Sequence, residues 1–327
     1  MVRYVDICKA QGDDALAQLA GARGPFDRIE WLALLARECH PGREAFVAVA
    51  EGDGRVAALP LLREAGGRLA GLGNWYSFWH GPLGEAALLP DIARSLAGRA
   101  HAISLSHLSE DAAASLASAF RRAGWITFGA PCDRNHVVFL KGRSFAEYWA
   151  ARPGRLRETV RRKGRKGLVS LTISDCFDAA AWSAYESIYA RSWKPEEGSP
   201  AFLRAFAEAE SAAGRLRLGI AEIEGKAVAA QFWTVEAGTA FIHKLAHDEE
   251  AKAHSPGTLL SAALFEHVID RDRVELIDFG TGDDPYKRDW MEDVRIRHAV
   301  TAYRPQNPRA WPDIVRTAAR QFLSRSG

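Results

Sequence analysis

Apolar side chains recur along the chain at two spacings, and together these predict a succession of helices and strands. In residues 27–39 every third or fourth position is apolar, which is the period of a helix with one buried face. Apolar runs at 46–50 and 56–62 flank a Glu-Gly-Asp-Gly turn, which is typical of a hairpin. The first half is further predicted to contain strands at 3–8 and 103–108, a helix at 111–123 and a strand pair over 125–140 around Pro131.

The second half repeats this mixture of elements. Ser144 followed by Glu147 is the signature of a helix capping box. The elements predicted after it are helices at 179–193, 200–213, 259–269 and 311–323, with strands at 216–223, 227–235, 239–246, 274–279 and 296–303. This order builds an α/β (α+β) domain with a mixed central sheet flanked by helices, so we expect two such domains, 1–143 and 144–327.

Chain length and composition fit this view. The 327 residues exceed the usual size of a single core, and 47% hydrophobic with 26% charged residues is ordinary for a soluble globular protein. A net charge of +2 is too balanced for a surface that binds DNA throughout. There is no apolar run of 18 residues and no leader pattern at the start, so a cytoplasmic protein without a transmembrane segment is expected.

The four cysteines and the histidines show no metal-ligand spacing. Cys8, Cys39, Cys132 and Cys176 lie far apart without a C-x-x-C pair, which excludes a zinc ribbon or a disulfide framework. We expect reduced, mostly buried thiols and no bound metal.

The segment Asp278-Phe279-Gly280-Thr281-Gly282-Asp283-Asp284-Pro285-Tyr286-Lys287 is the strongest candidate for chemistry. A buried strand ends at an acidic residue and a loop rich in polar groups follows, as at many active sites on sheet edges. The alternative is a Gly-Asp turn whose carboxylates only hold their own backbone. Burying an unpaired carboxylate in a strand costs free energy, which favours a function for Asp278.

Two further segments are suited to anionic ligands. Pro256, Gly257 and Thr258 lie between a strand and a helix, where backbone N–H groups can bind phosphate, although Pro is also common at ordinary helix starts. The run 152–166 holds eight Arg and Lys residues against one Glu and could receive the phosphates of a nucleotide cofactor, a carrier protein or an RNA. A solvated basic helix face is the competing explanation, and its glycines predict a poor helix.

Several isolated residues are candidates for binding or catalysis. His243 lies on a predicted strand, where it is a general base or, more often, a hydrogen-bonded structural residue. Gln231 on the preceding strand can orient a carbonyl, and Trp193 ends a helix beside a loop suited to a lid. Trp75 and Tyr76 belong to an aromatic segment that fills a core or lines a pocket for a hydrophobic chain.

The motif order of residues 145–303 resembles the FemAB-like and CelD-like branch of the GNAT superfamily. The resemblance rests on the D-F-G-x-G-D-x-x-Y-K segment from Asp278 to Lys287 and on the P-G-x-L-L helix start at Pro256. Ser192-Trp193-Lys194, Arg161-Arg162-Lys163 and Ala229-Ala230-Gln231 are also similar to that branch. The first 140 residues match only in layout, as a degenerate N-terminal half.

This resemblance implies two tandem GNAT-like domains and an N-acyltransferase that moves an acyl group from a thioester to an amine. Acyl-CoA or an acyl carrier protein is expected as co-substrate, with no permanently bound cofactor. In the expected mechanism Asp278 or His243 accepts the amine proton, Tyr286 protonates the leaving thiolate and Lys287 stabilises negative charge. Phosphates would be bound by Pro256, Gly257, Thr258, Arg161, Arg162 and Lys163, and substrates by Trp193, Gln231, Asp283, Asp284, Trp75 and Tyr76.

Two other readings stay open. An aminoacyl-tRNA-dependent transferase of the peptidoglycan-bridge type needs a broader basic surface than a net charge of +2 promises, so tRNA is a less favoured partner. A non-catalytic sugar- or lipid-binding module would account for the aromatic segment, but it would not need an intact Asp278–Lys287 loop. The acceptor is expected to be a small molecule, a lipid or a saccharide that carries an amine.

Overall fold

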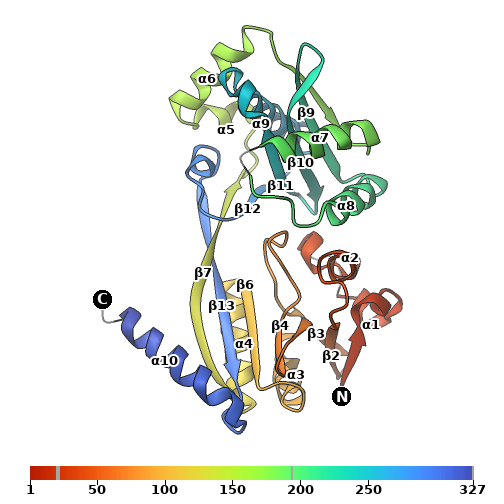
Figure 1. Cartoon of the computed structure of the whole chain (residues 1–327), viewed down its shortest axis with the longest axis vertical. Coiled ribbons are helices and arrows are strands. Elements are labelled where there is room, and N and C mark those ends of the chain that lie inside the picture. The colour runs from red at the N-terminus through yellow and green to blue at the C-terminus, as the bar shows by residue number, and fades with distance from the viewer. Residues whose placement is uncertain (20–22, 193, 326–327) are drawn as a thin grey trace. The chain divides into compact units, whose positions relative to one another are not determined.

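A computed structural model describes residues 1–19, 23–192 and 194–325 (Figure 1). The chain forms two compact units: unit 1 is Met1–Arg134 with Arg295–Gly327, and unit 2 is Asn135–Val294. The division expected at 143/144 therefore differs from the structure in one main respect, the placement of the C-terminal segment. It belongs to unit 1 because β13 (Asp293–Tyr303) pairs with β6 (Ala102–Leu108) and because Arg68 forms an ion pair with Asp313 of α10 (Trp311–Arg325).

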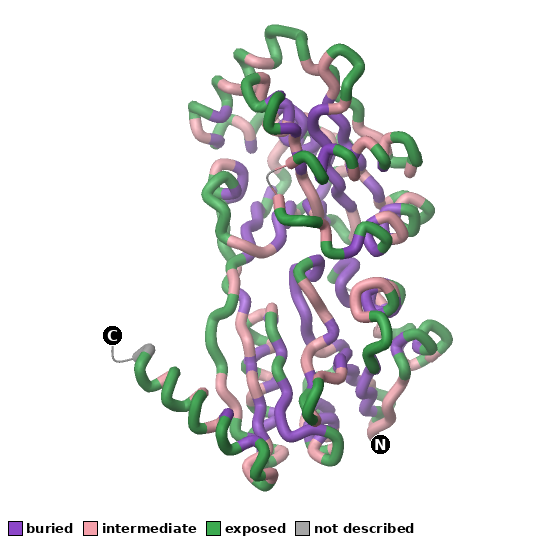
Figure 2. Tube along the Cα trace, viewed as in Figure 1, coloured by how far each residue is buried: buried purple, intermediate pink, exposed green. Residues whose placement is uncertain are grey.

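Unit 1 is built on a mixed sheet in the order β1-β2-β3-β4-β6-β13-β7, with helices packed on it. Side chains from α3 and α4 join the strands in one apolar core, and the buried strands are visible in Figure 2. Its remaining elements are β1 (Val2–Asp6), α1 (Asp14–Ala17), α2 (Ile29–Cys39), β2 (Ala45–Gly52), β3 (Arg55–Glu64), β4 (Arg68–Gly71), β5 (Leu83–Gly84), α3 (Leu89–Leu96) and α4 (Glu110–Arg122).

Unit 2 contains the sheet order β7-β12-β11-β10-β9-β8. The β11 and β12 strands run parallel, whereas the other neighbouring strands are antiparallel. The elements are the end of β7 (Ile126–Phe139), α5 (Phe145–Ala150), α6 (Gly154–Gly164), β8 (Ser170–Ser174), α7 (Ala179–Arg191), α8 (Pro200–Ala212), β9 (Leu216–Ile223), β10 (Lys226–Glu236), β11 (Thr239–His247), α9 (Pro256–Glu266) and β12 (Leu276–Thr281).

Helices cover both faces of the unit 2 sheet. Phe232 of β10 packs edge-on against Trp182 of α7, while the next residue, Trp233, packs against Phe265 of α9. Because successive side chains of a strand point to opposite faces, α7 and α9 lie on opposite sides of the sheet. Gly219 of β9 allows α9 to approach closely, since a Cβ there would lie 2.9 Å from a methyl group of Leu264.

Local sequence signals account for several helix starts. The predicted capping box is present: Ser144 accepts from the N–H of Glu147, and the Glu147 carboxylate accepts from the N–H of Ser144. The Ser199 hydroxyl likewise accepts from the N–H of Phe202 at the start of α8. Such bonds satisfy N–H groups that have no partner within the helix.

Three expectations from the sequence were wrong. Residues 125–140 form one long strand, β7, because Pro131 lies where β12 does not pair and no ladder hydrogen bond to β12 is lost there. The basic run does form a helix, α6, with Gly154 and Gly164 at its two ends, where glycine costs least. The cysteines are not mostly buried: Cys8, Cys132 and Cys176 are exposed and Cys39 is half-buried.

The predicted fold class is confirmed: each unit is a mixed sheet flanked by helices. Among the described residues, no helix has the length and apolar character needed to cross a membrane.

Candidate functional site

The parallel strands of unit 2 part soon after they begin. β11 pairs with β12 from Thr239 to Phe241, opposite Leu276 to Asp278, and the pairing described for the two strands ends there. β11 nevertheless continues to His247 and stays paired with β10 on its other edge. The second half of β11 therefore presents backbone N–H and C=O groups at an edge that β12 no longer covers.

A pocket of about 560 Å³ lies along this edge. It is lined by the end of β11, the start of α9, and the segment that follows β12. The lining residues are Leu156, Gln231, Leu245, Ala246, His247, Lys252, Ser255, Pro256, Gly257, Thr258, Ser261, Phe279, Tyr286, Asp289 and Trp290. Candidate residues from three separate segments of the chain meet here: Pro256 to Thr258, Gln231 and Tyr286.

The N-terminus of α9 opens onto this pocket. Ser255 has left-handed backbone angles (φ 55°, ψ 43°), Pro256 occupies the first turn, and no side chain caps the helix. The partial positive charge of the helix start and the N–H groups of Gly257 and Thr258 therefore face the pocket end. A Cβ at Gly257 would only touch the His247 ring, at 3.5 Å, so the space around this residue is not tight.

Gln231 fixes the first turn of α9. Its amide nitrogen donates to the Gly257 carbonyl (3.0 Å) and to the Ser261 hydroxyl (2.7 Å), and its amide oxygen accepts from the Trp233 indole N–H (3.0 Å). The side chain is 1% exposed. These bonds give Gln231 a positioning role, while carbonyl orientation stays a prediction.

Tyr286 is the predicted catalytic residue that lines the pocket. Its ring packs edge-on against Phe279, and the side chain is 37% exposed. Burial, together with the Asp284 carboxylate, raises the pKa of Tyr286 above its ordinary value. The phenol therefore keeps its proton at neutral pH and can act as a hydrogen-bond donor or an acid.

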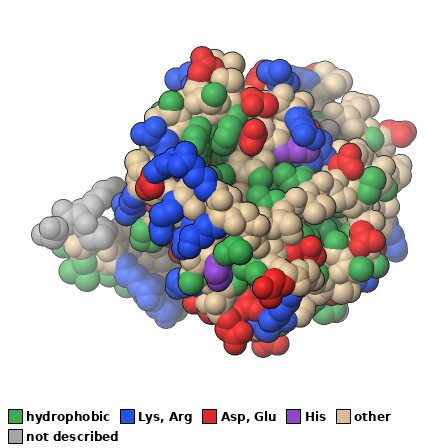
Figure 3. Space-filling model, turned by 90° about the horizontal axis from the view of Figure 1, so that it is seen from above, with side chains coloured by type: hydrophobic (Ala, Val, Ile, Leu, Met, Phe, Trp, Pro, Cys, Tyr) green, Lys and Arg blue, Asp and Glu red, His purple; other side chains and the backbone are tan. Residues whose placement is uncertain are grey.

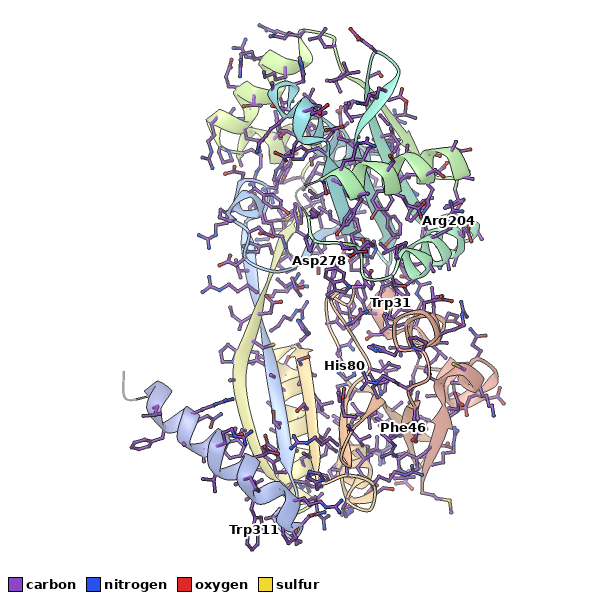
Figure 4. The ribbon with its side chains drawn as sticks, viewed as in Figure 1. Trp31, Phe46, His80, Arg204, Asp278 and Trp311 are labelled. Carbon is purple, nitrogen blue, oxygen red and sulfur yellow. The ribbon has the colours of Figure 1, made fainter. Side chains whose placement is uncertain are left out.

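Asp278 is held inside unit 2, as Figure 4 shows, with no exposed surface. Its Oδ1 accepts from the Asn135 amide (2.6 Å) and from the N–H of Gly280 (2.8 Å). Gly280 has φ 68°, a conformation that favours glycine. The carboxylate thereby fixes the turn that leads β12 away from β11.

The rest of the loop is tied to itself and to β7. The Lys287 ammonium is 4% exposed and donates to the carbonyls of Thr281 and Gly282. Asp283 accepts from His136 of β7 (2.9 Å) and from Arg288. The hydrogen bonds of Lys287 and Asp283 hold the loop in one conformation. Charge stabilisation by Lys287 and substrate binding by Asp283 stay predictions.

His243 lies on the other face of the sheet. It is the extra residue of a bulge in β11, since Phe232 pairs with Lys244 and Trp233 with Ile242. The His243 ring packs on Phe232, with ring centroids 5.1 Å apart, and its Nε2 is 2.8 Å from the Thr234 hydroxyl. His243 is not one of the described residues that line the pocket. Its role as a general base stays a prediction.

A second pocket of about 520 Å³ lies between α7, α8 and the segment that joins them. Lys194 lines it, beside Tyr189. Burial, together with the charges of Lys244 and Lys287, lowers the pKa of Lys194 to about 8, against an opposing effect of Asp284. Lysines from three separate segments thus lie close enough to influence one another.

The remaining predicted residues have different surroundings. Trp75 and Tyr76 belong to unit 1, where Trp75 is 49% exposed and Tyr76 is buried. Arg161 pairs with Glu158 on α6, and Lys163 donates to the Ala253 carbonyl. Trp193 lies outside the described residues.

His247 also lines the pocket, although it is not among the site residues predicted from the sequence. It ends β11 beside the start of α9, and burial lowers the pKa of His247, so its imidazole is neutral at physiological pH. His247 and Pro256 are nine residues apart and belong to no common sequence motif. Only the fold shows that both line the same pocket.

Replacing Asp278 tests its positioning role. Asp278→Asn keeps an acceptor for Asn135 and Gly280, so we expect the free energy of unfolding to fall by about 1 kcal/mol. Asp278→Ala leaves both donors buried without that acceptor and is expected to cost about 3 kcal/mol. Urea denaturation measures both changes; equal losses for the two variants would contradict the role.

The lowered pKa of Lys194 predicts unusual reactivity. At pH 8 about half of its amine is neutral, against less than about 1% for a lysine with an ordinary pKa. Dilute acetic anhydride at pH 8 should therefore acetylate Lys194 at least about tenfold faster than the exposed Lys226, as measured by peptide mass spectrometry. Between pH 9 and pH 10 the Lys194 rate should level off while the Lys226 rate still rises. Equal rates at pH 8 would show that the amine is not perturbed.

Comparison with known proteins agrees with this geometry. Residues 154–288 match the family model described as "Acetyltransferase (GNAT) domain". The matched range begins at the first residue of α6 and includes the whole Asp278–Lys287 segment. Comparison with curated proteins finds no match for the sequence.

Solved structures share the fold at low sequence identity. A conserved protein of unknown function from Bacteroides thetaiotaomicron is 12% identical, with a TM-score of 0.63 over 93% of this chain and 100% of its own. FemX is 10% identical, with a TM-score of 0.62 over 91% of this chain and 96% of its own. A tandem GNAT protein from the clavulanic acid biosynthesis pathway is 14% identical, with a TM-score of 0.54 over 91% of this chain and 98% of its own.

These similarities support the tandem arrangement of two α/β halves that the sequence predicts. The residues that line the pocket fall inside the range that the family model matches, except for Asp289 and Trp290. Residues 154–288 are therefore similar to a GNAT-type acetyltransferase domain, and the protein is a transferase.

Proposed function

We propose that the protein is an N-acyltransferase of the FemAB-like and CelD-like branch, acting in the cytoplasm. It would transfer an acyl group from an acyl thioester, either acyl-CoA or an acyl carrier protein, to an amine. The observation that carries the proposal is the uncapped start of α9, which opens onto the pocket along the exposed edge of β11. The helix start suits a phosphate, and the edge of β11 that β12 leaves unpaired suits a chain of amides.

The donor would lie along β11. Its phosphate would accept hydrogen bonds from the N–H groups of Gly257 and Thr258, where the helix dipole favours an anion. The amide groups of its pantetheine arm would bond to the β11 backbone beyond Phe241, as an added strand does. Leu245, Phe279 and Trp290 supply apolar walls for the methylene groups.

The reaction needs no covalent intermediate on the enzyme. The neutral amine attacks the thioester carbonyl carbon, a C–N bond forms, and the C–S bond breaks with the electron pair on sulfur. Tyr286 donates its phenolic proton to the departing thiolate and regains one from solvent. The proton lost by the amine passes to water or to a nearby base. Asp278 and Lys287 bind the backbone of the loop that carries Tyr286, so their role in this mechanism is to position Tyr286.

Gly257 offers a test of donor binding that spares the fold. Gly257→Asp places a carboxylate in the first turn of α9, which favours the helix but repels a phosphate. We expect CoA and acetyl-CoA to raise the melting temperature of the wild-type protein and of Gly257→Ala. Gly257→Asp should weaken CoA binding at least about tenfold in isothermal titration without lowering its own melting temperature. Equal CoA affinity in all three proteins would exclude α9 as the phosphate site.

Tyr286→Phe tests the acid. A thiolate with a pKa of about 8.5 leaves readily, so we expect kcat to fall by about a hundredfold, at the lower end of what general acids supply. Thiol release from the best-binding acyl-CoA, measured with a panel of amines, gives the rate. The Kd for CoA should stay within about twofold of wild type. An unchanged kcat would remove Tyr286 from the mechanism.

A further inference from the structure

α6 carries a cluster of cations without acidic partners. Arg157, Arg162, Lys163, Arg165 and Lys166, here termed the α6 patch, form no ion pair with a carboxylate in the described part of the chain. Four of them are exposed and Lys163 is half-buried. Figure 3 shows Lys and Arg side chains gathered on the face of the molecule where α6 lies. Such a patch attracts an anionic partner by its local field.

The α6 patch differs from most of the charged surface of unit 2. Many other cations of unit 2 are paired with carboxylates. These pairs are Arg143 and Arg152 with Glu292, Arg191 with Asp248, Arg215 with Glu210, Arg217 with Asp272, Lys244 with Glu197, and Arg288 with Asp283. Opposite charges side by side cancel at a distance. A partner would therefore be recognised by α6 and its immediate surroundings.

The patch adjoins the entrance of the donor pocket. Leu156 of α6 lines the pocket, as does Lys252 just before α9. Lys163 donates to the carbonyl of Ala253, two residues before Ser255. A partner that covers the patch would thus lie beside the uncapped start of α9.

We propose that the α6 patch docks a small acidic carrier protein, which delivers the acyl group on its phosphopantetheine arm. The inference rests on the proposed function and names its donor. The arm carries a single phosphate, which matches the single helix start at the pocket. Carboxylates on the carrier surface would face the α6 patch, which gives charge complementarity and a fast, salt-dependent encounter.

An RNA donor fits the patch less well. The 11 residues of α6 span about 16 Å, and the paired cations around it offer no continuation for a long phosphate backbone. The chain as a whole carries a net charge of only +2. The dimensions favour a compact acidic protein, and binding of RNA becomes an outcome of the test.

The test measures binding of three probes to the full chain: a phosphopantetheinylated acyl carrier protein, CoA and total tRNA. The variant is Arg165→Glu with Lys166→Glu. The matched control, Lys226→Glu with Arg271→Glu, makes the same change of charge at exposed positions outside the α6 patch. A further variant, Arg165→Gln with Lys166→Gln, guards against loss of helix stability, and melting temperatures show that each protein is folded.

We expect the α6 reversal to weaken carrier-protein binding at least about tenfold and the neutralised variant to weaken it less, with the control within about twofold of wild type. CoA affinity should stay within about twofold in all variants. Carrier binding that is absent, or unchanged in the α6 variants, while CoA still binds overturns the inference and leaves the proposed function standing. Binding of tRNA in preference to carrier protein overturns it in favour of an RNA donor. Failure of both CoA and carrier protein to bind removes the proposed function as well.

Discussion

The early end of pairing between β11 and β12 is the constraint on which the site depends. Two parallel strands that stayed paired would satisfy the β11 edge and leave no pocket. β12 turns away because Asp278 binds the N–H of Gly280, whose positive φ begins the turn. The same carboxylate binds Asn135, so the turn is anchored to β7 on the far side of β12. A cavity is thus maintained by a buried ionisable group instead of by a bound ligand.

The sequence contained the local part of this arrangement. Ser144 and Glu147 predicted a capping box that the structure contains, and the hairpin strands 216–223 and 227–235 lie within about one residue of β9 and β10. Such features depend on residues near one another in the chain. The helix start at Pro256 followed the same logic, because it depends on residues that are consecutive in the chain. The bonds from Gln231 of β10 to Gly257 and Ser261 of α9 were not predicted, because they join distant segments.

What could not be predicted depends on contacts between distant segments. The bulge at His243 shifts the side-chain alternation of β11, so counting along the strand cannot show which face the imidazole occupies. The lowered pKa of Lys194 arises first from burial and then from Lys244 and Lys287, which the fold brings from two other segments. Pro131 suggested a break in β7, but only the pairing pattern shows that Pro131 lies outside the part of β7 that pairs with β12. In each case the missing information is tertiary.

The order of the two units along the chain has a consequence for biosynthesis. Unit 2 is one continuous segment, whereas unit 1 is completed by β13 and α10, which are translated after all of unit 2. During synthesis β6 therefore lacks its neighbour β13 until after all strands of the unit 2 sheet have been translated. Because domains fold as units when their chain is complete, the transferase half is able to fold first, and the exposed edge of β6 is the part of the nascent protein most in need of protection from aggregation.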